Sequence, residues 1–297
     1  MDIFSFLTNK KQKPLSNYHQ LPKLQVSFIR GRRHRVDVPY ALPKDELEEE
    51  RINFQHYALH KLLGGNYHAP IDHTVERILD VGTGTAQWAY DIARQFPHAQ
   101  VCGLDLEQSR GTGFLSPENY SFVQGNILEP LPFPDNTFDF VHQRLLVSAI
   151  PTAHWPTVVQ ELIRVTRPGG YIELAEAGNC YHHVGVHTYT FLQWGQAASA
   201  QRSIDLATMK HLGELLARAK LGHINTRTFL LPVGSWGGKE GALYAKDMYA
   251  AFQGLKNFFC QVGGIDPHQF DATLSALPQE WEAYHTTHEF YVAYGQK

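Results

Sequence analysis

The stretch RILDVGTGTAQWAYDIARQFPHAQVCGLDLE, residues 77–107, carries the fold signal of this chain. A short apolar run leads directly into Gly82-Thr83-Gly84 and then into a helical pattern. Two glycines therefore stand where the backbone must turn tightly and approach a ligand closely. Asp105 ends the next apolar run, 21 residues beyond Gly84, where a carboxylate can accept both hydroxyls of a ribose. Together these features predict an adenosine-binding site.

Two classes of adenosine cofactor share this layout. The dinucleotide fingerprint G-x-G-x-x-G needs its third glycine at position 87, where this chain has Gln87. S-adenosylmethionine has no phosphate and carries a sulfonium cation, so it favours acidic and polar neighbours over an exposed helix N-terminus. Asp80, at the end of the first strand, supplies one carboxylate. The residues favour S-adenosylmethionine, with an NAD-dependent oxidoreductase as an alternative.

Short apolar runs alternate with helical patterns on both sides of this stretch, which indicates a parallel sheet covered on both faces. We expect strands at residues 77–81, 100–105, 120–125, 138–141, 171–175 and 288–295, and a helix followed by a strand within 209–234. Further helices are expected at 86–95, 155–165, 241–263 and 267–284.

The N-terminal part reads differently. Residues 1–43 are polar, and the basic run at 30–35 is expected to be solvated. An amphipathic helix follows, with acidic residues at 45–50, an apolar stripe through Phe54, Ala58 and Leu62, and a stop at Gly64-Gly65. We expect a covering arm and the start of this helix over 1–53, then a single domain over 54–297. Helical lid insertions are expected at about 177–205 and 238–286.

Composition narrows the function classes. The 297 residues are 43% hydrophobic, enough for a real core, and the net charge of −3 argues against nucleic-acid binding. No long apolar stretch or secretory signal is evident, and the three cysteines form no paired framework. These observations favour a cytoplasmic protein that acts on a small molecule, without a membrane or nucleic-acid partner.

The chain resembles the class I S-adenosylmethionine-dependent methyltransferases over residues 54–176. The family pattern D/E-x-G-x-G-x-G corresponds to residues 80–86, with Ala86 in place of the last glycine. The acid after the second strand matches Asp105, and the adenine-flanking pair falls on Asn126 and Ile127. The segments FDFVHQR and RVTRPGGYIELAE complete the likeness. The resemblance implies a doubly wound, mostly parallel seven-stranded sheet and S-adenosylmethionine as cofactor.

A narrower resemblance is to the LaeA-like group of methyltransferases, which occur around secondary metabolism. It rests on the run at 38–65, the tryptophan in GTAQWAYDIA, the HQR after the fourth strand and the ending YVAYGQK. In that group the helix before the first strand covers the cofactor. The cofactor-binding residues expected from the motifs and the resemblance are Gln55, His56, Asp80, Gly82, Thr83, Gly84, Trp88, Asp105, Leu106, Asn126, Ile127, His142, Gln143 and Arg144.

No side chain is singled out as an obligatory base. His142, Glu176, His182 and His183 are the candidates for one, should the acceptor be a hydroxyl. No metal site is expected, because no carboxylate lies close in sequence to the histidines that follow residue 181. The expected activity is direct methyl transfer to a small-molecule, secondary-metabolite acceptor. The alternative is a cofactor-binding regulatory protein that acts through a protein partner.

Overall fold

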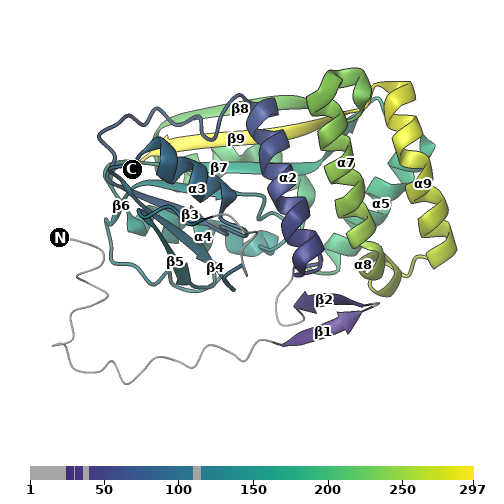
Figure 1. Cartoon of the computed structure of the whole chain (residues 1–297), viewed down its shortest axis with the longest axis horizontal. Coiled ribbons are helices and arrows are strands. Elements are labelled where there is room, and N and C mark those ends of the chain that lie inside the picture. The colour runs from purple at the N-terminus through teal and green to yellow at the C-terminus, as the bar shows by residue number, and fades with distance from the viewer. Residues whose placement is uncertain (1–24, 30, 36–39, 110–114) are drawn as a thin grey trace.

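The computed structural model describes residues 25–29, 31–35, 40–109 and 115–297. Its centre is a seven-stranded sheet in the order β5-β4-β3-β6-β7-β9-β8 (Figure 1). The first five strands in that order are parallel, and β9 runs antiparallel to both its neighbours. The expected doubly wound, mostly parallel sheet is confirmed. The strands are β3 Arg77–Val81, β4 Gln100–Asp105, β5 Tyr120–Gln124, β6 Phe138–Arg144, β7 Thr166–His182, β8 Gly222–Pro232 and β9 Thr287–Gln296.

Helices cover both faces of the parallel part because alternate residues of its buried strands point to opposite sides. On one face α3, Gln87–Gln95, packs through Trp88 and Ile92 onto Ile78 and Phe140. On the other face α4, Trp155–Val165, and α6, Leu212–Arg218, pack onto residues such as Leu79 and Val141. Among the described residues, no helix combines the length and the apolar character that crossing a membrane requires.

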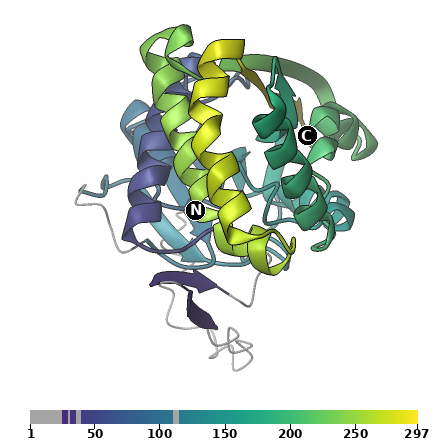
Figure 2. The same cartoon turned by 90° about the vertical axis from the view of Figure 1, so that its right-hand side faces the viewer.

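The remaining helices form a second cluster over β7, β8 and β9. This cluster contains α5 Val186–Ala200, α7 Gly238–Gly254, α8 Lys256–Gln261 and α9 Pro267–Tyr284. Helix α2, Glu46–Leu63, lies alongside α7, and α9 continues the row (Figures 1 and 2). Phenylalanines 191, 259, 270 and 290 form the buried centre of the cluster. It covers the end of the sheet that lies farthest from β5 (Figure 1).

Some sequence expectations need correction. The strand expected at 171–175 is longer and reaches His182, so the first residues of the expected 177–205 lid belong to the sheet. The helix expected at 241–263 is two helices, because α7 ends at Gly254 and α8 begins at Lys256. In α2 the buried positions include His56, Leu59 and Leu63 beside Ala58.

The basic run is not simply solvated where the structure describes it. Strands β1, Val26–Ile29, and β2, Arg32–Arg35, form an antiparallel hairpin. Arg32 donates to both carboxylate oxygens of Asp45, the N-cap residue of α2, and Arg33 donates to both oxygens of Glu107 beyond β4. His34 and Arg35 are buried. These contacts fix the hairpin to the edge of the domain where β4 ends.

Candidate functional site

A cavity of about 290 Å³ lies at the carboxyl ends of β3, β4 and β6. Open parallel sheets place ligands at this edge, where neighbouring strands lead into different loops. Helix α2 contributes Ile52 and Gln55 to the wall. Residues just before α2, including Tyr40, Leu42 and Lys44, line it as well. These residues before α2 therefore form part of the cavity wall.

The glycine turn after β3 forms the floor of this cavity. Gly82 has a φ of 71°, and a Cβ atom there would come within 2.6 Å of the Leu146 side chain. Gly84 also has a positive φ, and its N–H donates to Oδ2 of Asp105 over 2.9 Å. Any larger residue at position 82 would displace Leu146, so the turn requires glycine both for its conformation and for its close packing.

Asp105 stands at the rim of the cavity with two partners. Gly84 N–H holds one carboxylate oxygen, and Nζ of Lys44 lies 3.4 Å from the other. The side chain is only 13% exposed. Its orientation is therefore set by the turn that it faces, and Lys44 brings the N-terminal segment over it.

Asp80, His142 and Trp88 form a connected wall. Asp80 accepts from the Thr83 hydroxyl over 2.7 Å, and its other oxygen lies 2.9 Å from Nδ1 of His142. Burial lowers the pKa of His142, so the imidazole is neutral and donates from Nδ1 to Asp80. The ring stacks on the Trp88 indole with centroids 3.7 Å apart. Trp88 therefore packs in the hydrophobic core and also lines the cavity.

Arg144, at the end of β6, brings a positive charge to the same wall. Its guanidinium lies 3.0 Å from Nδ1 of His56, and Nε2 of His56 lies 3.0 Å from Asp91. Burial lowers the pKa of His56, which favours a neutral ring that donates to Asp91 and accepts from Arg144. Among the described residues, no carboxylate forms an ion pair with Arg144, so its charge is available to an anionic ligand group.

The expected cofactor-binding residues lie together around this cavity, except Gln143. Gln143 is fully buried and donates to Glu176. Asn126 lines the cavity, but its carbonyl oxygen already accepts from Leu128 N–H. The sequence reasoning missed Lys44 and Arg51, and it also missed Gln87 as a wall residue. The sequence pattern identifies Gln87 only as the residue that breaks the dinucleotide fingerprint.

A second cavity of about 200 Å³ adjoins the first, and Gln55, Leu145, Val147 and Ser148 line both. Its remaining wall comes mainly from the C-terminal strands and the helical cluster. Phe191, Phe252 and Phe259 give this wall an aromatic character. The sequence predicts helical insertions in this region, but only the fold shows which of their aromatic rings face a cavity.

Two polar side chains, Tyr244 and His288, stand in the wall of this second cavity. His288 Nε2 lies 3.0 Å from the carbonyl oxygen of Gly178, which can only accept, so Nε2 carries the hydrogen. The Tyr244 hydroxyl, 2.8 Å from Nδ1, therefore donates to that nitrogen. Burial lowers the pKa of His288 to about 4, so the ring is neutral near pH 7.

The candidate bases are placed apart. His142 lines the first cavity, whereas Glu176, His182 and His183 line neither of the two cavities. Glu176 accepts from Leu146 N–H and Val147 N–H, so it holds the loop after β6 in place. His182 pairs with Glu289 instead. Glu176 and His182 are therefore held by structural partners, and His288, which the sequence did not single out, is the histidine in the second cavity.

Comparisons with known proteins identify methyltransferase relatives. A family described as a methyltransferase domain matches residues 78–170. The methyltransferase str3 of Strobilurus tenacellus is 38% identical over 46% of this chain and 48% of its own length. The secondary metabolism regulator laeA of Aspergillus fumisynnematus is 31% identical over 46% of this chain and 36% of its own. The chain is therefore similar to class I methyltransferases of the LaeA-like group. The match thus spans about half the length of str3.

Among solved structures, a phosphoethanolamine N-methyltransferase 2 of Haemonchus contortus in complex with S-adenosyl-L-methionine is similar at 17% identity. Its TM-score is 0.46, and the match covers 82% of this chain and 57% of that one.

The cofactor of this LaeA-like chain is S-adenosylmethionine, and the residues of the first cavity fit it. Asp105 offers a carboxylate for the ribose, and Arg144 offers a cation for the carboxylate of the methionine part. Gln87 lines the cavity, and its buried Nε2 has no hydrogen-bond partner among the described residues. Such a buried donor is expected to be satisfied when a ligand is bound.

Proposed function

We propose that the chain transfers a methyl group from S-adenosylmethionine to a small, largely apolar acceptor bound in the second cavity. The observation that carries this proposal is the pair of adjoining cavities with a common wall at Gln55, Leu145, Val147 and Ser148. S-adenosylmethionine would supply a methyl group bonded to a positively charged sulfur. S-adenosylhomocysteine is the good leaving group in this transfer. The chain has to align an acceptor atom with that methyl group and exclude water.

The acceptor we infer bears a hydroxyl or N–H group on a flat apolar frame. The aromatic wall suits such a frame, and Tyr181 extends it by stacking on His288 with centroids 3.9 Å apart. Because the Tyr244 hydroxyl donates its proton to His288, its oxygen retains lone pairs that can accept from the acceptor molecule. Tyr244 is thus proposed to position the atom that is methylated.

The residues that hold the cofactor are part of the same proposal. Asp105 is assigned to the ribose hydroxyls, Gly82 and Gly84 to close backbone approach, and Arg144 to the carboxylate. The direct test is calorimetric titration of the full chain with S-adenosylmethionine. Asp105→Ala should weaken binding about tenfold or more, because each charge-assisted hydrogen bond contributes about 1.5–3 kcal/mol. Unchanged affinity in this variant would defeat the assignment of Asp105.

The acceptor is best sought without assumptions about its identity. A metabolite extract would be incubated with the protein and with S-adenosylmethionine labelled in its methyl group. Mass spectrometry of the small molecules should then reveal a labelled product, and S-adenosylhomocysteine should accumulate. A matched reaction with Asp105→Ala controls for methyl transfer by other proteins in the extract.

A second candidate function follows from relatives named as regulators, laeA and LAE1 of Cochliobolus heterostrophus. In that case the chain binds the cofactor and acts through a protein partner. The same experiments separate the two: normal cofactor affinity with no S-adenosylhomocysteine formed from any extract would favour the regulatory role over the enzyme.

A further inference from the structure

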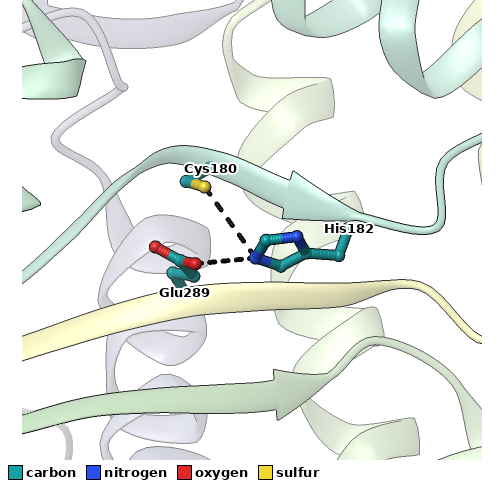
Figure 3. Close-up of side chains that lie close together, drawn as sticks. All are labelled: Cys180, His182 and Glu289. Atoms are coloured by element: carbon teal, nitrogen blue, oxygen red, sulfur yellow. Dashed lines mark hydrogen bonds and ion pairs between the residues drawn. The ribbon is translucent and has the colours of Figure 1, made fainter.

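Three side chains of types that bind metals meet on the face of β7 and β9 opposite to the second cavity. Cys180 and His182 come from β7, and Glu289 comes from β9 (Figure 3). Tyr181 and His288, which alternate with them along the two strands, line the cavity instead. Side chains of neighbouring residues in a strand point to opposite faces, so the two groups are separated by the thickness of the sheet.

The geometry of the three ligand atoms is compact. The Cys180 sulfur lies 3.9 Å from Nε2 of His182, and that nitrogen lies 2.7 Å from Oε1 of Glu289. All three atoms lie within 4.8 Å of one another. Zinc bonds of about 2.0–2.3 Å in a tetrahedron separate ligand atoms by about 3.2–3.8 Å. Movements of about 0.5–1 Å would bring this cluster to that arrangement.

We propose that Cys180, His182 and Glu289 bind a zinc ion. Thiolate, imidazole and carboxylate together suit zinc better than magnesium or calcium, which prefer oxygen ligands alone. The sequence reasoning expected no metal, since no carboxylate lies near the histidines along the chain. Glu289 follows His182 by 107 residues, and only the pairing of β7 with β9 brings them together.

The surroundings supply the other features of such a site. The hydroxyl of Tyr291 donates to Oε2 of Glu289 over 2.5 Å, which fixes the carboxylate and leaves Oε1 toward the cluster. A ligating carboxylate held by a second hydrogen bond is the usual arrangement. The His182 side chain is 42% exposed, so a water molecule can reach a fourth position. Lys210 is a nearby positive group, and its exposed side chain can turn away from the cluster.

A zinc ion here would tie β7 to β9 directly behind Tyr181 and His288. The proposed role is therefore to fix the wall of the second cavity, without contact with the cofactor or the acceptor. This inference does not depend on the proposed methyl transfer, because metal binding is measured separately from activity.

Cobalt(II) substitution is the test. The full chain, freed of metal by dialysis against a chelator, would be titrated with cobalt(II) and then with zinc in competition. A single equivalent of cobalt should give a thiolate charge-transfer band and the intense visible bands of tetrahedral coordination. Zinc should displace it, and elemental analysis of the zinc-loaded protein should give a single equivalent.

The variants assign the ligands. Cys180→Ser should abolish the charge-transfer band. His182→Ala and Glu289→Gln should weaken binding about tenfold or more, because even the loss of a group that orients a ligand has that effect. Cys260→Ser, at another thiol, and His183→Asn, at the next residue, should bind cobalt as the unmodified chain does. Calorimetric binding of S-adenosylmethionine shows that each variant is folded.

Other results would overturn the proposal. Absence of the charge-transfer band in the unmodified chain would leave the cluster as a hydrogen-bonded triad only. Equal cobalt affinity in the unmodified chain and His182→Ala would mean an adventitious ion only. The His182 side chain is less buried than that of Glu289, so the His182 variant keeps the test decisive even if Cys180→Ser does not fold.

Discussion

The guanidinium of Arg144 lies 3.0 Å from Nδ1 of His56, and the same ring contacts Asp91 through its other nitrogen. One neutral imidazole thus connects a carboxylate on α3 with a cation at the end of β6. Helix α2 carries the imidazole, so the helix that covers the cavity also orients its cation. In the described part of the chain no carboxylate pairs with Arg144, so its charge remains available in the cavity.

This relationship predicts the effect of removing the cation. Arg144→Leu should weaken S-adenosylmethionine binding about tenfold to a hundredfold, because charge-assisted hydrogen bonds to a carboxylate are lost. Calorimetry of the purified full chain measures it. Arg218→Leu, at a side chain that is 81% exposed, is the matched control and should bind normally. Comparable affinity in the two variants would remove Arg144 from the site.

Tyr244 provides a prediction for the acceptor side. Tyr244→Phe should lower kcat about tenfold, as expected for one lost hydrogen bond, and leave the KM for S-adenosylmethionine unchanged. Formation of S-adenosylhomocysteine with the identified acceptor is the measurement. Tyr249→Phe, a half-buried tyrosine on the same helix that lines neither cavity, should behave as the unmodified enzyme. A changed KM for the cofactor with an unchanged kcat would contradict the proposed position of Tyr244.

The left-handed backbone conformation of Ala86 leads to a prediction about stability. This residue caps α3 with a φ of 65° and a ψ of 12°, a left-handed conformation that glycine adopts without strain. Ala86→Gly should therefore raise the free energy of unfolding by about 0.5–1 kcal/mol. Denaturant unfolding checks the direction, and Ala89→Gly, inside the same helix, should instead destabilise the protein. A loss of stability in Ala86→Gly would show that the methyl group contributes more by packing than it costs in strain.

Glu173 predicts a dependence on pH. Burial raises its pKa to about 7, even though its Oε2 accepts from His68 N–H and Ala69 N–H. A carboxyl with a raised pKa in the folded state stabilises the protein fully below its unfolded value, near 4.5. That contribution is lost as the pH rises through about 7, and the loss is up to about 3 kcal/mol.

The variant Glu173→Gln isolates this group, because the amide oxygen can still accept both N–H groups. The free energy of unfolding of this variant, relative to that of the unmodified chain, should increase between pH 5 and pH 8 by up to about 3 kcal/mol. Thermal or denaturant unfolding across this range measures the difference. If the amide group destabilises the variant equally at every pH, the change between pH 5 and pH 8 is unaffected. A stability difference between the two proteins that stays constant with pH would therefore refute the raised pKa of Glu173.

The features predicted from sequence are those encoded within a short stretch. Gly82, Gly84 and Asp105 lie within one strand-helix-strand unit, so their spacing alone places them at one edge of the sheet. Helix α4 and helix α9 have the bounds expected from their apolar periods and from Pro267. Local patterns were sufficient there because each element carries its own start and stop signals.

The remaining parts of the site depend on residues that are far apart in sequence. Arg51 donates to Asp247, 196 residues away, within a buried network that joins α2 to α7. Tyr244 and His288 meet across 44 residues. No local period encodes such pairs. The histidines at 182 and 183 drew attention because they cluster in sequence, yet strand alternation and a turn place them away from the cavities.

The wall shared by the two cavities limits which substitutions can change the acceptor without also changing the first cavity. A substitution at Gln55, Leu145, Val147 or Ser148 alters both the first cavity and the proposed acceptor cavity. Substitutions at Phe191, Phe252 or Phe259 reshape the proposed acceptor cavity and leave the wall of the first cavity unchanged. Among relatives with different acceptors, we therefore expect sequence differences to gather on α5, α7 and α8. The four residues of the shared wall are expected to change little.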